Sequence, residues 1–420
     1  MMSLNQTPVA ERLHISIFGR RNVGKSSLIN ALTDQKIALV SEVAGTTTDP
    51  VYKTMELLPI GPVVITDTAG IDDMGELGQL RVERTIQVLN KTDLAVLVIE
   101  PEDGVTGFDS ELVSQIKARN IPVVAVLNKT DLLGKGPAQT GLSEENSEEV
   151  KELEKQLGLR LVLVSALTGE GIDELKRQII LMAPDDFDKT RLVSDLVKPG
   201  DLVVLVVPID KSAPKGRLIL PQQQVIRELI ESGAIAVVTR EHELKETLNS
   251  LGRKPSLVIT DSQAFEQVSA DTPKSIPLTS FSILFARYKG ELVPLIKGVK
   301  AVRDLKPDGK ILIVEGCTHH RQADDIARVK IPRWLRQKAG DELTFEWANG
   351  TFFPQDLTRF DLVVHCGGCM LNPREMKYRI ACCREKRVPI VNYGMLIAYV
   401  HGILERALEP FRLAAEPSDE

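Results

Sequence analysis

Residues 19–26 read Gly19-Arg-Arg-Asn-Val-Gly24-Lys25-Ser26 and lie between an apolar run at 14–18 and a helical pattern at 27–33. They match G-x-x-x-x-G-K-[ST], the phosphate-binding loop that joins a strand to a helix. The glycines let backbone N–H groups wrap phosphates, and the helix N-terminus adds the positive end of its dipole. We expect Lys25 to reach the β and γ phosphates and the Ser26 hydroxyl to ligate Mg²⁺. The stretch therefore predicts a nucleotide-binding α/β domain.

The surrounding sequence has the pattern of a doubly wound sheet. Short apolar runs, typical of buried parallel strands, alternate with helical patterns. These runs lie at 14–19, 62–70, 93–100, 121–131 and 159–167. We therefore predict an α/β P-loop domain over residues 1–183.

Two further polar stretches can complete a magnesium site. Asp67-Thr-Ala-Gly70 follows a strand, which places a carboxylate near Mg²⁺ and the Gly70 N–H near the γ phosphate. The loop Ala44-Gly45-Thr46-Thr47-Thr48-Asp49 can supply a hydroxyl to the same ion, and Thr47 is the candidate ligand.

A fourth motif selects the base. Asn128-Lys129-Thr130-Asp131 ends an apolar run, and the Asp131 carboxylate can accept hydrogen bonds from N1–H and the N2 amino group of guanine. Adenine presents neither donor, so the motif predicts GTP. Ser165-Ala166-Leu167 closes the set. A second Asn-Lys-Thr-Asp, from Asn90 to Asp93, precedes a strand instead of ending one, and we interpret it as a helix terminus.

With five motifs in this order, residues 13–183 resemble the translation-factor-like GTPases of the Era and MnmE type. The resemblance implies GTP hydrolysis, with Lys25, Asp67 and Gly70 as catalytic residues. Ile71 stands where many small GTPases have a water-orienting glutamine, so water must be positioned otherwise. Asn22 resembles the asparagine of the potassium-activated subset, and a polar loop residue without an ion is the alternative. The expected nucleotide contacts are Gly19, Asn22, Val23, Gly24, Lys25, Ser26, Ser27, Thr46, Thr47, Thr48, Asp67, Gly70, Asn128, Lys129, Asp131, Ser165, Ala166 and Leu167.

The rest of the chain predicts two smaller α/β domains, over residues 184–280 and 281–420. The first has strand patterns at 202–209, 234–240 and 255–261 and helical patterns at 222–233 and 241–252. The run at 202–209 fits either a core strand or a strand whose edge pairs across a dimer. In the second, apolar positions from Phe281 to Val299 recur at helical spacing and predict a helix. Strands follow at 309–316, 360–366 and 387–394.

All five cysteines fall in the last quarter of the chain, and two groups of them follow predicted strands. Cys317-Thr-His319 and His365-Cys366-Gly-Gly-Cys369 bring thiolates and imidazoles to neighbouring strand ends. Soft thiolates favour zinc or an iron–sulfur cluster, and the residues leave both open. Adjacent helical residues point about 100° apart, so we interpret Cys382 and Cys383 as packing residues.

This cysteine and histidine pattern behind a GTPase domain resembles the HydF family of [FeFe]-hydrogenase maturation GTPases. The resemblance implies a dimerising middle domain and a [4Fe–4S] cluster on Cys317, Cys366 and Cys369. His319, His365, Glu315 or an exchangeable group would be the fourth ligand. It also implies a scaffold that receives a diiron precursor made with radical-SAM maturases and delivers it to apo-[FeFe]-hydrogenase.

Charge and hydropathy limit the partners that we expect. The net charge of −6 argues against a general affinity for nucleic acid. No apolar run approaches the roughly 18 residues of a membrane span, and the first residues lack the pattern of an export signal. We therefore expect a cytoplasmic protein without nucleic-acid or membrane partners. The competing hypothesis is an RNA-associated Era/MnmE-like GTPase with a structural zinc site.

The Asn22 assignment can be tested by exchanging salts. Potassium should raise GTP turnover above sodium at equal ionic strength, because a monovalent cation beside Asn22 takes part of the electrostatic role of an arginine finger. Equal steady-state rates in the two salts would refute that role.

Overall fold

The computed structural model describes residues 7–33, 51–68, 85–133, 144–184, 191–209, 218–316, 325–350 and 352–411. The chain divides into two compact units, residues 1–189 and 190–420. The architecture of each unit is mixed α/β, with mainly parallel sheets, as the sequence predicts. No helix among the described residues is long and apolar enough to span a lipid bilayer.

In the described part of the first unit, six strands form one sheet in the order β2-β3-β1-β4-β5-β6. Only the pairing of β2 with β3 is antiparallel. The bounds are β1 Leu13–Phe18, β2 Val51–Leu57, β3 Gly61–Asp67, β4 Leu94–Ile99, β5 Val123–Leu127 and β6 Leu161–Leu163. Every residue of β1, β4 and β5 is buried, which explains why these strands appear in the sequence as apolar runs without alternation.

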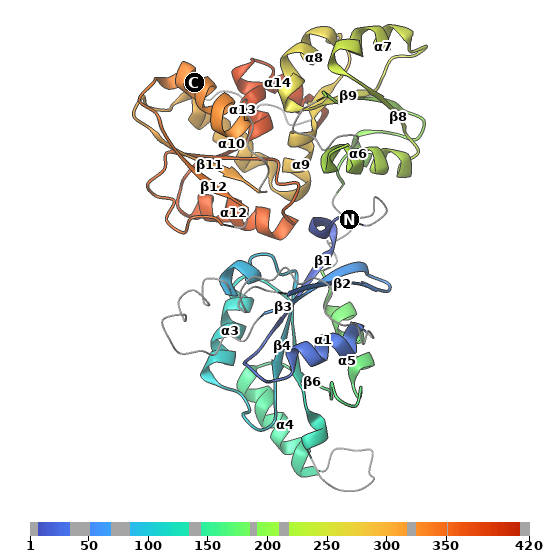
Figure 1. The fold of residues 1–420 in the computed structure, drawn as a ribbon, viewed down its shortest axis with the longest axis vertical. Coiled ribbons are helices and arrows are strands. Elements are labelled where there is room, and N and C mark those ends of the chain that lie inside the picture. The colour runs from blue at the N-terminus through green and yellow to red at the C-terminus, as the bar shows by residue number, and fades with distance from the viewer. Residues whose placement is uncertain are drawn as a thin grey trace. The chain divides into compact units, whose positions relative to one another are not determined.

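Helices cover both faces of this sheet (Figure 1). Helices α1 Lys25–Thr33 and α5 Ile172–Met182 pack on one face, and α3 Gly107–Ala118 and α4 Glu144–Leu157 lie on the other. Residues 85–89 are also helical. The five predicted parallel strands are confirmed, whereas β2 was not predicted from the sequence.

The second unit contains two parallel sheets within its described residues. One has the order β10-β9-β7-β8 and the other β12-β11-β13-β14. The bounds are β7 Leu202–Val206, β8 Ile235–Thr239, β9 Leu257–Thr260, β10 Leu278–Ser280, β11 Lys310–Glu315, β12 Thr344–Asn349, β13 Leu362–His365 and β14 Ile390–Asn392. Strand β7 pairs with both β8 and β9, so residues 202–206 form a core strand and not an edge. Strands β10 and β12 were not predicted from the sequence.

Most helices of the second unit alternate with its strands. Their bounds are α6 Leu220–Glu231, α7 Leu244–Ser250, α8 Phe265–Asp271, α9 Phe281–Lys289, α10 Leu292–Arg303, α11 Ile331–Ala339, α12 Pro373–Glu385, α13 Tyr393–Val400 and α14 Leu404–Leu408. Asn372 caps α12 through a side-chain oxygen that accepts the Glu375 N–H, with Pro373 in the first turn.

The single helix predicted from Phe281 to Val299 is wrong, because two helices share this stretch. Gly290 ends α9 in an extended conformation, and its N–H donates to Ala286 O. A Cβ at Gly290 would lie 2.8 Å from Ile380 Cδ1, so the chain turns where α12 approaches it closely. Helix α9 lies between the two sheets (Figure 1), and its apolar residues contribute to the cores of both.

Close packing of α10 on β14 gives a stability test. A Cβ at Gly298 would lie only 1.8 Å from Ile390 O, so Gly298→Ala must displace backbone. We expect it to destabilise the second unit by about 1–3 kcal/mol or more, as overpacking does. Gly252→Ala is the control, since nothing lies within 4 Å of its Cβ position, and should change stability by less than about 0.5 kcal/mol. Urea unfolding of the full chain measures both, and equal unfolding midpoints would contradict the packing argument.

Candidate functional site

The phosphate-binding loop connects β1 to α1, and neither of its two glycines can be replaced by a residue with a side chain without displacing its neighbours. Gly19 has φ +146°, and a Cβ there would lie 2.3 Å from Val98 O. Gly24 has φ +89°, and its Cβ would lie 2.3 Å from Asn128 Nδ2. The loop backbone therefore passes so close to β4 and to the base-recognition motif that only glycine fits.

The charged and polar side chains of this loop are placed for phosphate and magnesium. The Lys25 ammonium donates to Gly19 O at 2.7 Å and to Arg20 O at 2.6 Å, which holds it against the loop that would wrap the phosphates. The Ser26 hydroxyl donates to Asp67 Oδ2 at 2.6 Å. A hydroxyl and a carboxylate brought together in this way are hard oxygen ligands of the kind that Mg²⁺ prefers.

Asn128 connects three of the predicted motifs. It is 1% exposed, its Nδ2 donates to Val23 O at 2.8 Å, and its Oδ1 accepts from the Ala166 N–H at 3.1 Å. One buried amide thus ties the base-recognition loop to the phosphate loop and to the Ser165-Ala166-Leu167 segment. Its role is to position these loops.

The residue that would read guanine is exposed and oriented. The Asp131 carboxylate is held by the Ser165 hydroxyl, which donates to Oδ1 at 2.6 Å. Lys129 has φ +62°, and its ammonium forms an ion pair with Glu100, which is 6% exposed at the end of β4. Glu100 was not predicted as a site residue, because its pairing with Lys129 depends on the neighbouring positions of β4 and β5 in the sheet.

The remaining predicted nucleotide residues divide into described and undescribed positions. Asn22 is exposed in the loop with φ +66°, Val23 is buried, and Ser27 and Leu167 are exposed. Thr46, Thr47, Thr48 and Gly70 lie outside the described residues.

The second Asn-Lys-Thr-Asp stands at the end of a helix, as interpreted from the sequence. The Asn90 N–H donates to Ile86 O, and the Asp93 carboxylate accepts the His14 N–H at 2.9 Å. Both side chains are buried. This copy therefore fastens the start of β4 to β1.

The candidate metal site begins where β13 ends. The Cys366 sulfur accepts the Gly316 N–H at 3.1 Å and the Gly368 N–H at 3.4 Å. N–H groups directed at a cysteine sulfur stabilise its thiolate and are a common way in which proteins tune bound clusters. Gly316 directly precedes Cys317 in the chain and is the last described residue before it. These donors fit a thiolate-bound metal or cluster.

Burial keeps the isolated Cys366 thiol protonated. It raises the pKa of Cys366 to about 11, although the N–H bonds from Gly316 and Gly368 and the positive charge of Arg379 act in the opposite direction. A metal must therefore displace a proton on binding. Within the described residues, no three Cys, His, Asp or Glu side chains form a metal-binding group; Cys317 and His319 lie outside them.

The other proposed ligands differ in their surroundings. His365 is completely buried; its Nδ1–H donates to Cys366 O at 2.8 Å, and its Nε2 accepts from Arg379 Nη1 at 3.1 Å. Burial first, then the Arg379 charge, lowers the pKa of His365 to about 3, so the ring is neutral. Both ring nitrogens are thus in use, and metal binding by His365 would require loss of the Arg379 bond.

Glu315 ends β11, is 8% exposed and lies in register with Asn349.

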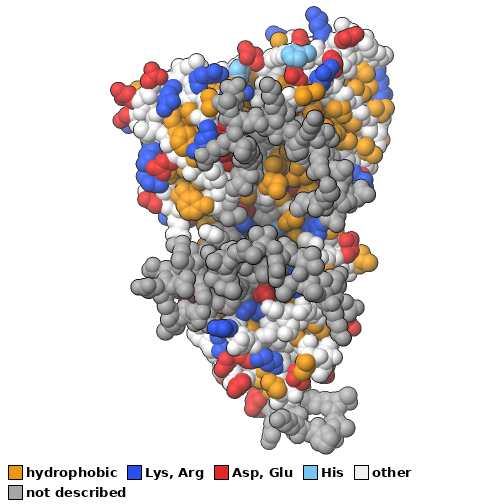
Figure 2. Space-filling view, in the orientation of Figure 1, with side chains coloured by type: hydrophobic (Ala, Val, Ile, Leu, Met, Phe, Trp, Pro, Cys, Tyr) orange, Lys and Arg blue, Asp and Glu red, His pale blue; other side chains and the backbone are white. Residues whose placement is uncertain are grey.

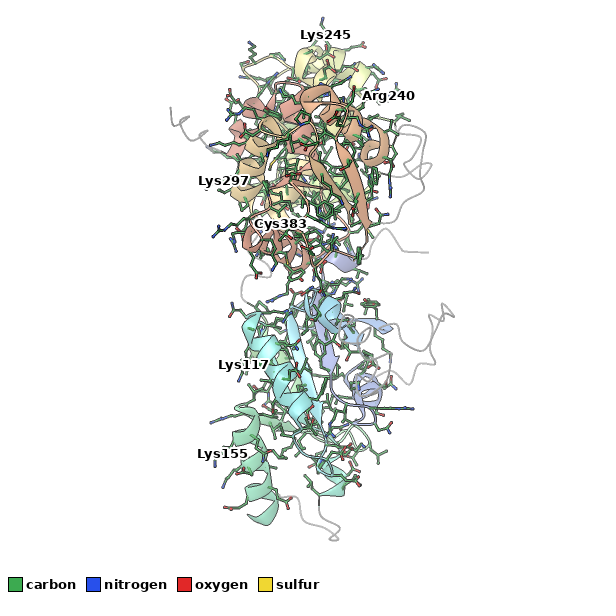
Figure 3. The ribbon with its side chains drawn as sticks, turned by 90° about the vertical axis from the view of Figure 1, so that its left-hand side faces the viewer. Lys117, Lys155, Arg240, Lys245, Lys297 and Cys383 are labelled. Carbon is green, nitrogen blue, oxygen red and sulfur yellow. The ribbon has the colours of Figure 1, made fainter. Side chains whose placement is uncertain are left out.

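The remaining described cysteines have different environments. Cys369 is half-buried at the far end of the loop from Cys366. On α12, Cys383 is fully buried among the packed side chains of the second unit (Figure 3), and burial raises its pKa to about 12. Cys382, also half-buried, packs against the same core. This arrangement agrees with the packing role inferred for both.

Comparison with known families assigns each part of the chain. Residues 192–290 match the family model of the hydrogen maturase F dimerization domain, and residues 293–410 match that of its tetramerization domain. Residues 14–129 match the 50S ribosome-binding GTPase family, and residues 79–185 match the elongation factor Tu GTP binding domain. The first unit is therefore a GTPase domain, and the second carries domains for self-association.

Individual GTPases are similar to part of this chain. The tRNA modification GTPase MnmE of Laribacter hongkongensis is 37% identical over 174 residues, 41% of this chain and 35% of that protein. GTPase Der of Wolinella succinogenes is 34% identical over 197 residues, 43% of this chain and 39% of that protein. The chain thus spans little more than a third of the length of these relatives. A structure of an Aquifex aeolicus Era variant bound to GDP and AlF4− is 23% identical, covers 57% of this chain and 98% of that chain, and has a TM-score of 0.35.

The geometry around Asp131 predicts how guanine selection can be lost. Asp131→Asn replaces an acceptor of two guanine N–H groups by an amide that presents donors of its own. Hydrogen bonds to a charged group contribute about 1.5–3 kcal/mol, so GTP affinity should fall at least about tenfold. Competition binding of GTP against xanthosine triphosphate, whose C2 carbonyl accepts a hydrogen bond, should shift toward the latter. Unchanged preference for GTP would refute the assignment.

Proposed function

Because the chain belongs to the hydrogen maturase F family, we propose that it is a GTP-hydrolysing scaffold for [FeFe]-hydrogenase maturation. In this proposal it holds a [4Fe–4S] cluster on Cys317, Cys366 and Cys369 and carries a diiron precursor. Radical-SAM maturases supply that precursor, and apo-[FeFe]-hydrogenase receives it. The family resemblance carries the identity of these partners.

One observation supports the cluster most directly. The sulfur of Cys366 accepts two backbone N–H groups, one of them from Gly316, the residue before Cys317. When bound, the cluster would supply an iron that thiolates do not saturate, since three cysteines serve four irons. His319, His365 and Glu315 are the proposed fourth ligands. Of the two that the structure describes, His365 already uses both ring nitrogens in hydrogen bonds to Cys366 and Arg379, so we favour Glu315.

The GTPase unit would act as a switch. Lys25 would neutralise phosphate charge, and Gly70 would contact the γ phosphate. Mg²⁺ would be held by Ser26, Thr47 and Asp67. Asn22 would hold K⁺ near the phosphates. Ile71 stands at the position where many small GTPases have a glutamine that orients water, so this chain lacks that group there. GTP can change partner affinity only if it binds two conformations of the chain differently.

Self-association as a homodimer is supported by the edge of the first sheet of the second unit. Strand β8 is an edge strand with Ile235 and Val238 each 47% exposed, and Ile230 of α6 is 62% exposed. Hydrophobic side chains reach the surface on the side where β8 and α6 lie (Figure 2). An exposed apolar edge favours pairing with another strand, so we propose that β8 of a second copy covers it.

The competing function is an RNA-associated GTPase with a structural zinc site. The net charge of −6 and the hydrogen maturase F matches over residues 192–410 both argue against it. We therefore do not favour it.

Iron and acid-labile sulfide per chain after anaerobic reconstitution test the proposed cluster. Cys317→Ser, Cys366→Ser and Cys369→Ser should each lose most of the iron, because a serine hydroxyl is harder and less readily ionised than a thiol. Glu315→Gln or His365→Asn should retain most of it.

Cys382→Ser and Cys383→Ser are the matched controls. They should leave the iron content unchanged and lower at most the stability of the fold, because both cysteines lie on α12 and pack in the hydrophobic core of the second unit. A requirement for Cys383 as strict as that for Cys366 would refute the three-thiolate site, and colourless zinc-loaded protein would favour the RNA-associated alternative.

A further inference from the structure

Two positively charged side chains are completely buried beside the loop that carries Cys366 and Cys369. Lys289, at the end of α9, and Arg379, in α12, are both 0% exposed. A buried cation is costly to remove from water unless hydrogen bonds or opposite charges compensate it. We call residues 366–371 the cysteine loop. Lys289 binds carbonyl groups of this loop, and Arg379 binds His365, the residue directly before it.

Lys289 holds the end of the cysteine loop. Its ammonium donates to Cys369 O at 2.9 Å and to Leu371 O at 2.6 Å. The same loop is closed by the Leu371 N–H, which donates to Gly368 O at 2.9 Å. The ammonium also lies 5.6 Å from the ring centroid of Phe285, one turn earlier on α9. One buried cation therefore fixes two carbonyl groups at and just after Cys369.

Arg379 holds the beginning of the loop through His365. Its Nη1 donates to His365 Nε2 at 3.1 Å, which leaves the ring proton on Nδ1, and that N–H donates to Cys366 O at 2.8 Å. Its Nε donates to Glu375 Oε1 at 2.9 Å, and its Nη2 donates to Gly350 O at 2.8 Å. The guanidinium is thus fixed from three sides.

We propose that Lys289 and Arg379 are positioning residues that clamp both ends of the cysteine loop, and that the buried positive charge of Lys289 raises the reduction potential of the cluster. The inference rests on the proposed function. A nearby positive charge stabilises the more negative, reduced state of a cluster, and it does so more strongly in a protein interior than in water.

The first experiment compares two Lys289 variants with a matched control. Lys289→Met and Lys289→Gln remove the charge, and Gln serves where Met impairs folding. The control is Arg287→Met, two residues earlier on α9. The Arg287 guanidinium donates to the Asp195 carboxylate and to Leu192 O, and none of its described hydrogen bonds reaches the cysteine loop. Redox titration of each reconstituted full-length variant, followed by electron paramagnetic resonance, gives the potential.

In both Lys289 variants, the ratio of reduced to oxidised cluster at a fixed potential should fall at least tenfold. For a one-electron couple this corresponds to a reduction potential lower by about 59 mV. Arg287→Met should change that ratio less than threefold. Equal ratios for the Lys289 and Arg287 variants would overturn the charge effect.

Hydrogen–deuterium exchange in the iron-free full chain tests the clamp without the cluster. The Leu371 amide should exchange at least tenfold faster in Lys289→Met than in wild type, and at the wild-type rate in Arg287→Met. Unchanged exchange in Lys289→Met would overturn the clamp. If wild-type protein binds no iron at all, the proposed function fails, but this exchange experiment still decides the clamp.

The contribution of Arg379 has its own measurement. Nitrogen-15 NMR of histidine-labelled wild-type protein should show His365 in the neutral tautomer protonated at Nδ1, and Arg379→Lys should produce a mixture of tautomers. A His365 ring protonated at Nε2 in the wild type would overturn the Arg379 part of the proposal, and that result requires no variant.

Discussion

The chemistry of both units depends on the alignment of the carboxyl ends of parallel strands at one edge of a sheet. In the GTPase unit, β1, β3 and β5 end at Phe18, Asp67 and Leu127, and the residues at or after those ends form the nucleotide motifs. In the second unit, β11 and β13 end at Glu315 and His365, directly before the cysteine groups. Hydrogen-bonded pairing of the strands therefore brings together side chains that are far apart in the sequence.

The two sites differ in how far their functional groups are exposed. In the nucleotide site, Lys25 is buried, whereas Ser26 and Asp131 are exposed, as suits groups that bind a ligand from solvent and release it again. Behind the cysteine loop, Arg379 and Glu375 form an ion pair that is almost completely buried. Breaking such a pair costs about 3–5 kcal/mol, because one charge is left buried without its partner. A buried ion pair therefore lies behind the cysteine loop, and the buried Asn128 amide joins the loops of the nucleotide site.

Sequence reasoning succeeded where a pattern reflects one local requirement. The apolar runs of β1, β4 and β5 are recognisable because every residue is buried. It failed where a neighbour decides the outcome. The spacing of apolar residues continues through Gly290, but α9 ends before this glycine and α10 begins at Leu292, with Pro294 in its first turn. Strand β12 was missed because only Ala348 of its six residues is buried, so it lacks the apolar run of a core strand.

By itself, the sequence determined the α/β class, the guanine nucleotide motifs and the grouping of Cys366 with Cys369, since each depends on residues close together in the chain. Only the tertiary structure decided that Lys129 pairs with Glu100 and that His365 is held between Cys366 and Arg379. It also showed that Lys289 lies completely buried against the carbonyl of Cys369. These contacts join residues up to 80 positions apart, and their partners are selected by how strands and helices pack in space, which no local pattern of residues records.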